Sequence, residues 1–457
     1  MYIGIDVGTS GVKALAVDYQ GTVLAEHSVS YELSAPREGW AEQNPRDWLD
    51  AAVSCIAKLT ETEKCAGISF SGQMHGLVLL DDEAVVLRPA IIWCDQRTSK
   101  EAAELTELIG AERLAEITGS QAMTGFTAAK ILWVKNNEPE IWAKTRHILL
   151  PKDYVRLMLT GIVSTEPSDA AGTQLFDINS LDWSDEILEK LGIPRKLLPE
   201  IMRSNAETGR YGDIRVFSGG ADNACGAIGV GVTKPGSAML SIGTSGVILA
   251  PVDRAVTDPR GRIHTLCSAL PGQRMLMSCT QSAALSVKWF TELCGDIDYD
   301  DIPDSTNVVF LPYLNGERSP HPDPNAKGVF FGLTANTTRG EMLRAVYEGV
   351  AFSQRECLDV FRELGVEITS LTATGGGAKN RKWLQIFADI LGAAIEAPEL
   401  DQGAAYGAAL LAIDNGQLII DNERTVYVPD STADYTRKYE LYKELYVKLK
   451  TTFERLG

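Results

Sequence analysis

The sequence has no long apolar run, no excess of basic residues and no leader-like start. No stretch approaches the roughly 18 apolar residues of a membrane span, and residues 1–6 lack the features of a signal peptide. The 43 basic residues are outnumbered by 61 acidic ones, and the net charge of −18 argues against nucleic acid or an anionic membrane as a partner. We therefore expect a cytoplasmic protein that binds neither.

Cysteine pairs are also absent, because none of the eight cysteines belongs to a CxxC motif. Most of them lie in apolar segments, which favours buried free thiols in a reducing compartment over a disulfide framework or a zinc site. The composition, 45% hydrophobic and 23% charged, is typical of a globular protein, and a length of 457 residues predicts two domains or more.

One short segment, Gly-Thr-Ser-Gly-Val, occurs at residues 8–12 and again at residues 243–247. Each copy lies between two short apolar segments, which predicts a β-hairpin around a glycine-rich turn. Successive backbone N–H groups in such a turn form a concave anion site, and the threonine and serine hydroxyls add donors. We therefore expect the two hairpins to hold one polyphosphate from both sides, as in a two-lobed protein that uses ATP.

Short strands and helices alternate along the chain, which indicates an α/β fold. A helix is predicted from Pro45 to about Leu59, with Asn44 as its cap. A second helix is predicted at the end of the chain, where aromatic and apolar residues recur at helical spacing between Tyr435 and Phe453. Strands are predicted at residues 3–5, 12–17, 23–28, 65–71 and 368–372.

The polar, glycine-containing segment 205–215 interrupts this pattern, which then restarts with a predicted strand at 216–218. We therefore predict an N-terminal domain over residues 1–215 and a C-terminal domain over residues 216–457. The restart also suggests that the two halves arose by duplication.

Two aspartates follow or precede glycine-rich turns. Asp6 ends the first predicted strand, immediately before the first loop, where a carboxylate can hold Mg²⁺ against phosphate oxygens. Its alternative role is that of a turn aspartate that accepts local N–H groups. Asp222, among glycines and small residues, suits the acceptance of a hydroxyl proton in phosphoryl transfer, or else the capping of a helix.

Three further clusters suit small-molecule binding. Met74 and His75 lie in a glycine-flanked loop after a strand, where a histidine contacts substrate or serves structure. Trp93 offers an indole face to a sugar, while Asp95 and Arg97 either bind hydroxyls or pair with each other. Three glycines, at residues 375–377, lie between a predicted strand and a predicted helix over 383–391, a turn that suits close approach to a nucleotide.

Two longer motifs, at residues 125–137 and at 328–333 leading to 341–348, resemble the signatures of the FGGY carbohydrate kinases, within the actin-like ATPase superfamily. The resemblance covers essentially the whole chain and includes the segments 73–76, 150–154 and 311–321. It implies two actin-like (ribonuclease H-like) ATPase domains with a cleft between them, ATP and Mg²⁺ as cofactors, and a homodimer.

The resemblance also implies roles for individual residues. Asp222 is the expected catalytic base, and Asp6 the expected metal ligand. The expected sugar contacts are Gln73, Met74, His75, Trp93, Asp95 and Asp222. The expected nucleotide contacts are Thr9, Lys13, Gly243, Thr244, Gly375, Gly376 and Asn380.

The activity implied is ATP-dependent phosphorylation of a ketopentose, with D-xylulose giving D-xylulose 5-phosphate as the first expectation. Another pentulose, a deoxypentulose or gluconate would keep the chemistry and change the substrate. A non-catalytic sugar sensor and an actin-like filament or chaperone ATPase are the alternatives of other classes. The retained aspartates argue against the first of these, and the two signatures argue against the second.

Overall fold

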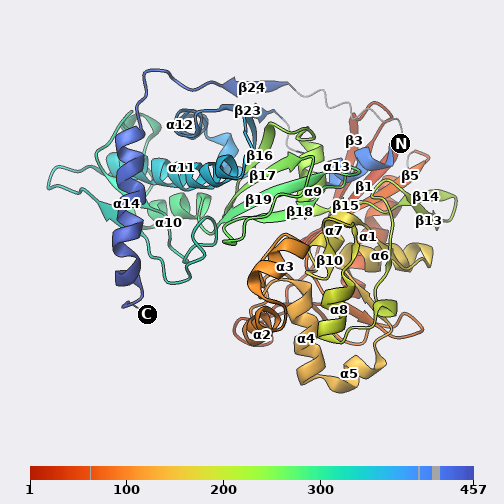
Figure 1. Cartoon of the computed structure of the whole chain (residues 1–457). Helices are drawn as coiled ribbons and strands as arrows, with labels where there is room; N and C mark the ends of the chain where they lie inside the picture. The colour runs from red at the N-terminus through yellow and green to blue at the C-terminus, as the bar shows by residue number, and fades with distance from the viewer. Residues whose placement is uncertain (62, 400–401, 414–422, 457) are drawn as a thin grey trace.

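The computed structural model describes residues 1–61, 63–399, 402–413 and 423–456. These residues form two seven-stranded sheets with helices packed on their faces, together with a mainly helical region that extends from the first sheet (Figure 1). The α/β class expected from the alternating pattern is confirmed.

The first sheet has the strand order β13-β14-β5-β1-β2-β3, with β15 beside β5. Its central strand β1 is antiparallel to β2 and parallel to β5. The predicted meander of three strands is confirmed. The strands are β1 (Tyr2–Val7), β2 (Gly11–Val17), β3 (Val23–Ser30), β5 (Gly67–Gly72), β13 (Glu207–Tyr211), β14 (Ile214–Phe217) and β15 (Gly220–Ala221).

The second sheet repeats this plan. Its strand order is β18-β19-β17-β16-β22-β23-β24, in which β16 is antiparallel to β17 and parallel to β22. The hairpin β16–β17 thus corresponds to β1–β2, which supports the duplication. The strands are β16 (Ser237–Ile242), β17 (Gly246–Val252), β18 (His264–Cys267), β19 (Arg274–Thr280), β22 (Ser370–Thr374), β23 (Ala394–Pro398) and β24 (Arg424–Tyr427).

The strand expected to open the second half belongs instead to the first sheet. β14 pairs in parallel with β5, with Val216 opposite Ile68, and β15 continues along the same strand. The physical reason is that Val216 is fully buried in a hydrophobic core with residues of β1 and β5. The local sequence around Val216 does not reveal which strands supply that core. The second sheet begins only at Ser237. The domain boundary at residue 215 itself stays a prediction.

Helices cover both faces of the first sheet. α1 (Pro45–Leu59) contacts β2 and β3, and α6 (Pro151–Thr160) contacts β5 and β13. α13 (Gly403–Ala412) lies against β1 and β5. α1 has the predicted bounds, and the Asn44 side chain accepts a hydrogen bond from the Arg46 N–H, as expected of its cap.

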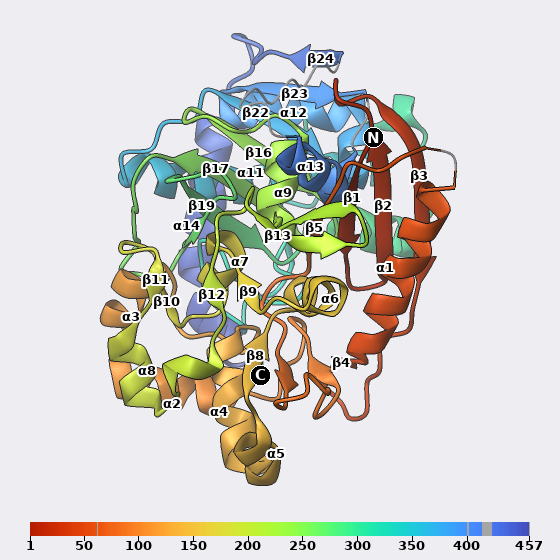
Figure 2. The ribbon, with the colours of Figure 1, turned by 90° about the vertical axis from the view of Figure 1, so that its right-hand side faces the viewer.

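α9 (Asp222–Gly229) and α13 lie side by side between the two sheets (Figures 1 and 2). Small residues allow this contact. A Cβ atom on Gly407 would lie 1.8 Å from the Cys225 carbonyl oxygen, and one on Gly4 would lie 1.9 Å from the Ala405 oxygen. The helix that begins at Asp222 is therefore held tightly against a helix from the end of the chain.

The helical region between β7 and α9 contains α2 (Ser99–Ile109), α3 (Ala111–Thr118), α4 (Thr127–Asn137), α5 (Pro139–Lys144), α7 (Pro167–Ala171) and α8 (Asp185–Leu191). Its short strands, together with those preceding it, are β4 (Glu42–Gln43), β6 (Val78–Leu80), β7 (Ala90–Ile91), β8 (His147–Leu149), β9 (Ser164–Thr165), β10 (Phe176–Asp177), β11 (Asp182–Trp183) and β12 (Glu200–Ile201). Most of these helices lie below the two sheets in Figure 1.

The second sheet is covered by α10 (Ala284–Cys294), α11 (Arg339–Glu363), α12 (Arg381–Leu391) and α14 (Thr436–Phe453), with the short pair β20 (Val309–Leu311) and β21 (Val329–Phe331) beside them. The predicted C-terminal helix is confirmed. Its buried residues Tyr439, Tyr442 and Tyr446 belong to the core around α11.

All eight cysteines lie in the described residues and are free thiols, as expected. Among the described helices, none has the length and apolar character needed to cross a membrane.

Candidate active site

The first loop, residues 8–11, closes the hairpin β1–β2 with a hydrogen bond of 3.0 Å from the Gly8 N–H to the Gly11 oxygen. The Thr9 hydroxyl donates to Gln73 Oε1 at 3.3 Å and accepts from Trp93 Nε1 at 2.9 Å. A predicted nucleotide contact is thus bonded to two predicted sugar contacts. The structure therefore brings the predicted phosphate loop and two of the predicted sugar contacts together at Thr9.

Gln43, in β4, supports the same loop and was not singled out from the sequence. Its Nε2 donates to the Thr9 carbonyl at 2.7 Å, and its Oε1 accepts from Gln73 Nε2 at 2.9 Å. Trp48 Nε1 donates to the same Oε1 at 3.1 Å. A lone glutamine carries no local signal of such a role, since it depends on partners far along the chain.

Asp6 lies at the end of β1, opposite Ser71 on β5 and Lys13 on β2. Burial raises the pKa of its carboxyl, partly offset by Ser71 and Lys13. Its Oδ1 atom is buried and has no hydrogen-bond partner among the described residues. An unpartnered carboxylate oxygen beside a phosphate loop fits the single carboxylate that Mg²⁺ takes alongside phosphate oxygens.

Lys13 points its ammonium group toward Glu26, with 3.6 Å between Nζ and the carboxylate. Both side chains are substantially exposed, so this ion pair holds Lys13 only weakly. Its role as a nucleotide contact stays a prediction.

Asp222 is the first residue of α9, and its carboxylate accepts a hydrogen bond of 2.7 Å from the Asn223 N–H. The residue that caps the helix is Ala221, so the alternative prediction that Asp222 is the cap is wrong. Burial, together with the negative charge of Asp6, raises the pKa of Asp222 to about 7. A carboxyl with that pKa can accept a proton near neutral pH.

The segment that leads into Asp222 is fixed by two hydrogen bonds from buried side chains. Ser168 Oγ accepts from the Ala221 N–H at 2.9 Å, and Arg156 Nη1 donates to the Ser218 oxygen at 2.8 Å. Ser168 in turn donates to Glu166. The position of Asp222 therefore depends on side chains of the preceding helices α6 and α7.

Arg156 and Glu166 belong to a buried group of charged side chains that we term the charge cluster: Lys152, Asp153, Arg156, Glu166 and Asp169. Lys152 Nζ lies 2.8 Å from Asp153, 3.3 Å from Glu166 and 3.1 Å from Asp169. All these side chains are fully buried. Burial opposes the charge of Lys152, yet the carboxylates outweigh it and raise the pKa of the ammonium group.

Burial also raises the pKa of Asp169 to about 8, although Lys152 opposes the shift. The charge cluster therefore holds more carboxyl groups than its cations neutralise. Lys152 and Asp153 were noticed in the sequence only as part of a family-like segment.

Residues 72–76, at the end of β5, contain Met74 and His75, and we term them the sugar loop after their predicted contacts. His75 has a backbone φ of 66°, in the left-handed region. Its Nδ1 lies 2.6 Å from the Gly172 oxygen, and since a carbonyl only accepts, this nitrogen carries the proton. Burial lowers the pKa of His75 to about 3, so the ring is neutral and Nε2 is left as an acceptor.

Two donors hold the strained backbone of His75. Lys130 Nζ donates to its carbonyl oxygen at 2.7 Å, and Thr127 Oγ1 donates to the same oxygen at 3.1 Å. Lys130 also donates to the Gly125 oxygen at 2.8 Å. Burial lowers the pKa of Lys130 to about 7. These residues lie in α4 and the turn before it, inside one of the family-like motifs.

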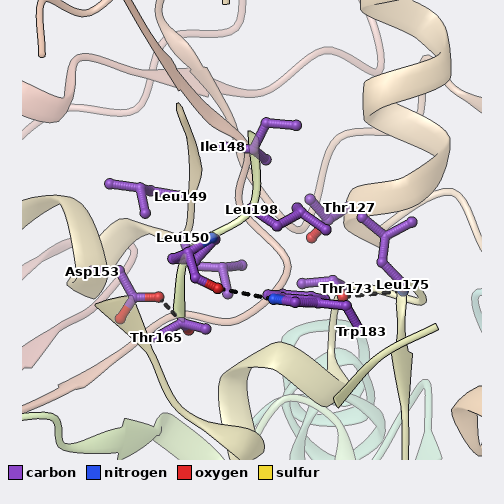
Figure 3. Close-up of a pocket in the computed structure, with 11 residues that line it drawn as sticks. Thr127, Ile148, Leu149, Leu150, Asp153, Thr165, Thr173, Leu175, Trp183 and Leu198 are labelled. Atoms are coloured by element: carbon purple, nitrogen blue, oxygen red, sulfur yellow. Dashed lines mark hydrogen bonds between the residues drawn. The ribbon is translucent and has the colours of Figure 1, made fainter. Parts of the chain in front are cut away.

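A small cavity is lined by Thr127 on one side and by Asp153 of the charge cluster on the other (Figure 3). Its volume is about 10 Å³, room for about one water molecule, so it is not the sugar site. Asp153 borders it and accepts a hydrogen bond of 2.6 Å from Thr165. Thr127 bonds the His75 oxygen, and Asp153 belongs to the charge cluster that supports Asp222. Residues that support His75 and Asp222 therefore border the same cavity.

Asn223 connects the sugar loop to the second sheet. Its Nδ2 lies 3.7 Å from Met74 Sδ and 3.8 Å from Met277 Sδ, on β19. Because Asn223 follows Asp222, the expected sugar contact Met74 lies near the start of α9, where the expected base is located.

Asp95 is fully buried, and both of its carboxylate oxygens are occupied. Arg97 donates to them through Nε and Nη2, and the Ala41 N–H donates to Oδ2 at 2.6 Å. The ion pair left open by the sequence is therefore formed. The further role of Asp95 as a sugar contact stays a prediction. Trp93 has the more open position, with 44% of its surface exposed.

The second loop, residues 243–246, lies against the glycine loop, residues 375–377. A Cβ on Gly375 would lie 3.4 Å from the Gly243 nitrogen, while one on Gly376 would meet no described atom within 4 Å. Thr244 is exposed, and its carbonyl oxygen accepts from the Ala283 N–H at 2.8 Å.

Asn380 caps α12 through Oδ1 and donates from Nδ2 to the Tyr347 hydroxyl at 3.0 Å. Its amide therefore has structural partners on both sides, and contact with a nucleotide stays a prediction. The second loop, the glycine loop and Asn380 are nevertheless neighbours, as expected of one nucleotide site.

Comparison with known families identifies the class of protein to which this doubled fold belongs. Residues 1–229 match the N-terminal domain, and residues 238–413 the C-terminal domain, of the FGGY family of carbohydrate kinases. The chain belongs to this family.

Several relatives resemble the chain over nearly its full length. A xylulose kinase of Bacillus subtilis is 38% identical over 98% of this chain and 97% of its own. A crystal structure of a xyloylose kinase from Brucella ovis matches with a TM-score of 0.93 and 37% identity, over 99% of both chains. A gluconate kinase from Lactobacillus acidophilus matches with a TM-score of 0.93 and 28% identity, over 100% and 99%.

Proposed function

We propose that this enzyme transfers the γ-phosphoryl group of ATP to D-xylulose and releases D-xylulose 5-phosphate and ADP. The observation that carries the proposal is the position of Asp222, whose neighbour Asn223 contacts Met74 in the sugar loop while Asp6 lies within electrostatic range. The similar xylulose kinases support the choice of sugar.

In the proposed reaction, Asp222 accepts the proton of the terminal sugar hydroxyl. The sugar oxygen then forms a bond to the γ-phosphorus while the bond from that phosphorus to the bridging oxygen of ADP breaks. The N–H groups of the two loops face the charge that develops on the transferred group. Asp6 would hold Mg²⁺, which offsets negative charge on the phosphates when it is bound.

The sugar itself would lie between the sugar loop and Trp93. The neutral ring of His75 offers Nε2 as an acceptor for a sugar hydroxyl, since Nδ1 is bound to Gly172. The indole of Trp93 is positioned by its hydrogen bond to Thr9, so its face is available to the C–H surface of the sugar.

The test measures sugar-dependent release of ADP over D-xylulose, D-ribulose, L-ribulose, L-xylulose, 1-deoxy-D-xylulose, gluconate and glycerol. We expect strong preference for D-xylulose. Replacing Asp222 by Asn should lower kcat at least ~100-fold with little change in sugar affinity, since general-base catalysis contributes about 10²–10⁴. Near-normal turnover by Asp222→Asn would overturn the role of this residue.

Gluconate is the second candidate substrate, because a gluconate kinase has the same fold with a TM-score of 0.93. Turnover of gluconate, of another pentulose or of a deoxypentulose would keep the chemistry and replace D-xylulose. Sugar binding without any turnover would favour a sensor.

Compartment and assembly also remain proposals. We propose a cytoplasmic enzyme, since each of the eight described cysteines is free, as suits a reducing compartment. We propose a homodimer on the family resemblance alone. Cell fractionation tests the first, and sedimentation equilibrium at several protein concentrations tests the second.

A further inference from the structure

His264 is a buried histidine of the second sheet that has no role so far. It begins β18, the strand whose Thr265 N–H donates to the Gly119 oxygen of the first half at 2.8 Å. Only 4% of its surface is exposed, and its Nδ1 atom has no hydrogen-bond partner among the described residues. Buried polar atoms are nearly always paired, so an unpaired ring nitrogen calls for a partner.

Two chains of contacts connect His264 to the sugar side of the site. Its ring centroid lies 6.1 Å from that of Phe126, which lies 4.0 Å from the ring of His75. Its cross-strand neighbour is Met277, whose sulfur lies 3.8 Å from Asn223 Nδ2. One side chain therefore separates His264 from His75, and one separates it from the residue that follows Asp222.

The ring of His264 is neutral near pH 7. Burial, together with the nearby Arg318 cation, lowers its pKa to about 4. A neutral imidazole has one N–H donor and one nitrogen acceptor, which matches a hydroxyl group that can both donate and accept. Packing against Phe126 alone would be served equally well by an apolar ring, which would leave no buried nitrogen unpaired.

We propose that His264 is a specificity-determining residue of the sugar site, supplied by the second sheet, which hydrogen-bonds one hydroxyl of the bound sugar. The ligand class is a polyhydroxylated chain with a hydroxyl at that position, in preference to a deoxy analogue. The inference rests on the proposed function only in placing a sugar between Met74 and Asp222.

The proposed contact also has a consequence for how the two halves of the chain are held together. His75 comes from the first half and His264 from the second, so a sugar that contacts both holds the two halves together. The contact thus favours the conformation in which both rings reach the sugar.

The test compares the variants His264→Phe and His264→Asn with the wild type. Phenylalanine keeps the ring and removes both nitrogens, whereas asparagine restores a polar group near Nδ1. We expect His264→Phe to raise KM for D-xylulose about 10-fold or more, and His264→Asn to raise it less, because a site built to bind a hydroxyl loses affinity when the partner is removed. His27→Phe, in the edge strand β3, is the matched control and should leave KM unchanged.

Deoxy sugars identify the hydroxyl. One of the monodeoxy analogues of D-xylulose, starting with the 1-deoxy sugar, should bind the wild type more weakly than D-xylulose does. The KM for that analogue should rise less than about twofold in His264→Phe, because the hydroxyl that His264 would contact is already missing. An unchanged KM in His264→Phe would overturn the proposal, and so would an equal loss for every analogue. Either outcome would assign His264 to packing.

The two proposals fail separately. If the wild type phosphorylates another sugar of the panel, the function is corrected and the same variants are measured on that sugar. Should both variants unfold, a crystal structure of the wild type with its sugar decides. A ring nitrogen of His264 within about 3.2 Å of a sugar hydroxyl is expected, and its absence would overturn the proposal.

Discussion

Two loops with identical residues lie in different surroundings. In the first, the Thr9 hydroxyl is bonded to Gln73 and Trp93, two of the predicted sugar contacts. In the second, Thr244 is exposed, and the loop lies against the glycine loop at Gly375. The repeated sequence explains the shared hairpin, whereas the partners of each threonine explain why the two loops differ in what they touch.

The layers behind the two loops also differ. Behind the first half, the charge cluster surrounds Lys152 with carboxylates and supports Asp222 through Ser168. Behind the second, Glu317 is buried with no ion pair among the described residues and accepts from the N–H groups of Gln281 and Arg318. The charge cluster thus consists of paired charges, whereas Glu317 is a single carboxyl that burial keeps protonated up to about pH 8. Opposite responses to mutation should follow.

The largest effect is expected from Lys152→Met, which leaves buried carboxylates without their central cation. Breaking a buried ion pair by removing one partner costs about 3–5 kcal/mol of unfolding free energy. Denaturant unfolding should show this loss. The loss should be smaller at pH 5.5 than at pH 8, because buried carboxyls without a cation take up protons more readily at the lower pH. Lys448→Met, at an exposed ion pair, is the control, and an equally small effect for Lys152→Met would contradict a central role.

Lys130→Met should come next, because it removes a donor from the carbonyl oxygens of His75 and Gly125. An unpaired buried acceptor costs about 1–3 kcal/mol, and we expect KM for the sugar to rise about 10-fold through misplacement of His75. KM for ATP should change little. Lys135→Met, on the same helix but bonded to Leu191, is the matched control. A rise confined to KM for ATP would contradict this interpretation.

Glu317→Gln should act in the opposite direction and stabilise the protein at high pH. Burial raises the pKa of Glu317 from 4.5 to about 8, so between these values the folded state binds a proton that the unfolded state releases. The stability from this proton is complete below pH 4.5 and is lost as the pH rises to about 8.

The variant should therefore unfold like the wild type at pH 4.5 and be more stable at pH 8.5, by at least about 1.4 kcal/mol, the equivalent of a single pKa unit. Thermal unfolding across this pH range is the measurement. Glu367→Gln, at an exposed glutamate, controls for the change in net charge, and a parallel pH profile for all three proteins would disprove the assignment.

The smallest effects should come from the two threonines. Thr9→Ala removes hydrogen bonds to Gln73 and Trp93, each worth about 0.5–1.5 kcal/mol, and should raise KM for the sugar about 2–10-fold. Thr244→Ala should raise KM for ATP instead. If both variants raise only KM for ATP, the first loop acts on the nucleotide alone and the contrast between the loops disappears.

Local signals in the sequence account for much of the fold. Asn44 and Pro45 define the start of α1 because capping involves neighbouring residues only. The two hairpins follow from glycine-rich turns between apolar segments, and the C-terminal helix follows from its spacing of aromatic residues. The pairing of β14 with β5 was not predictable, because its partner lies about 150 residues earlier in the chain and neither strand encodes the other.

The site divides in the same way. Glycine-rich turns and nearby aspartates are local patterns, and they predict the two loops and the roles of Asp6 and Asp222. The sequence could not decide between an ion pair and a sugar contact for Asp95, because the answer depends on the Ala41 N–H and on burial. His264, Lys130 and Gln43 were missed for a related reason. Each acts through partners brought close only by the folded chain.

The packing of α13 has a consequence for how the protein is made. This helix covers β1 and β5 of the first sheet, and Gly4 fits directly beneath Ala405, yet α13 is synthesised about 180 residues after β15 completes that sheet. At about 5–20 residues per second, a ribosome needs about 10–40 s to add them. During that interval the nascent sheet exposes an apolar face, so during translation we expect the first half to depend on chaperones more than the second.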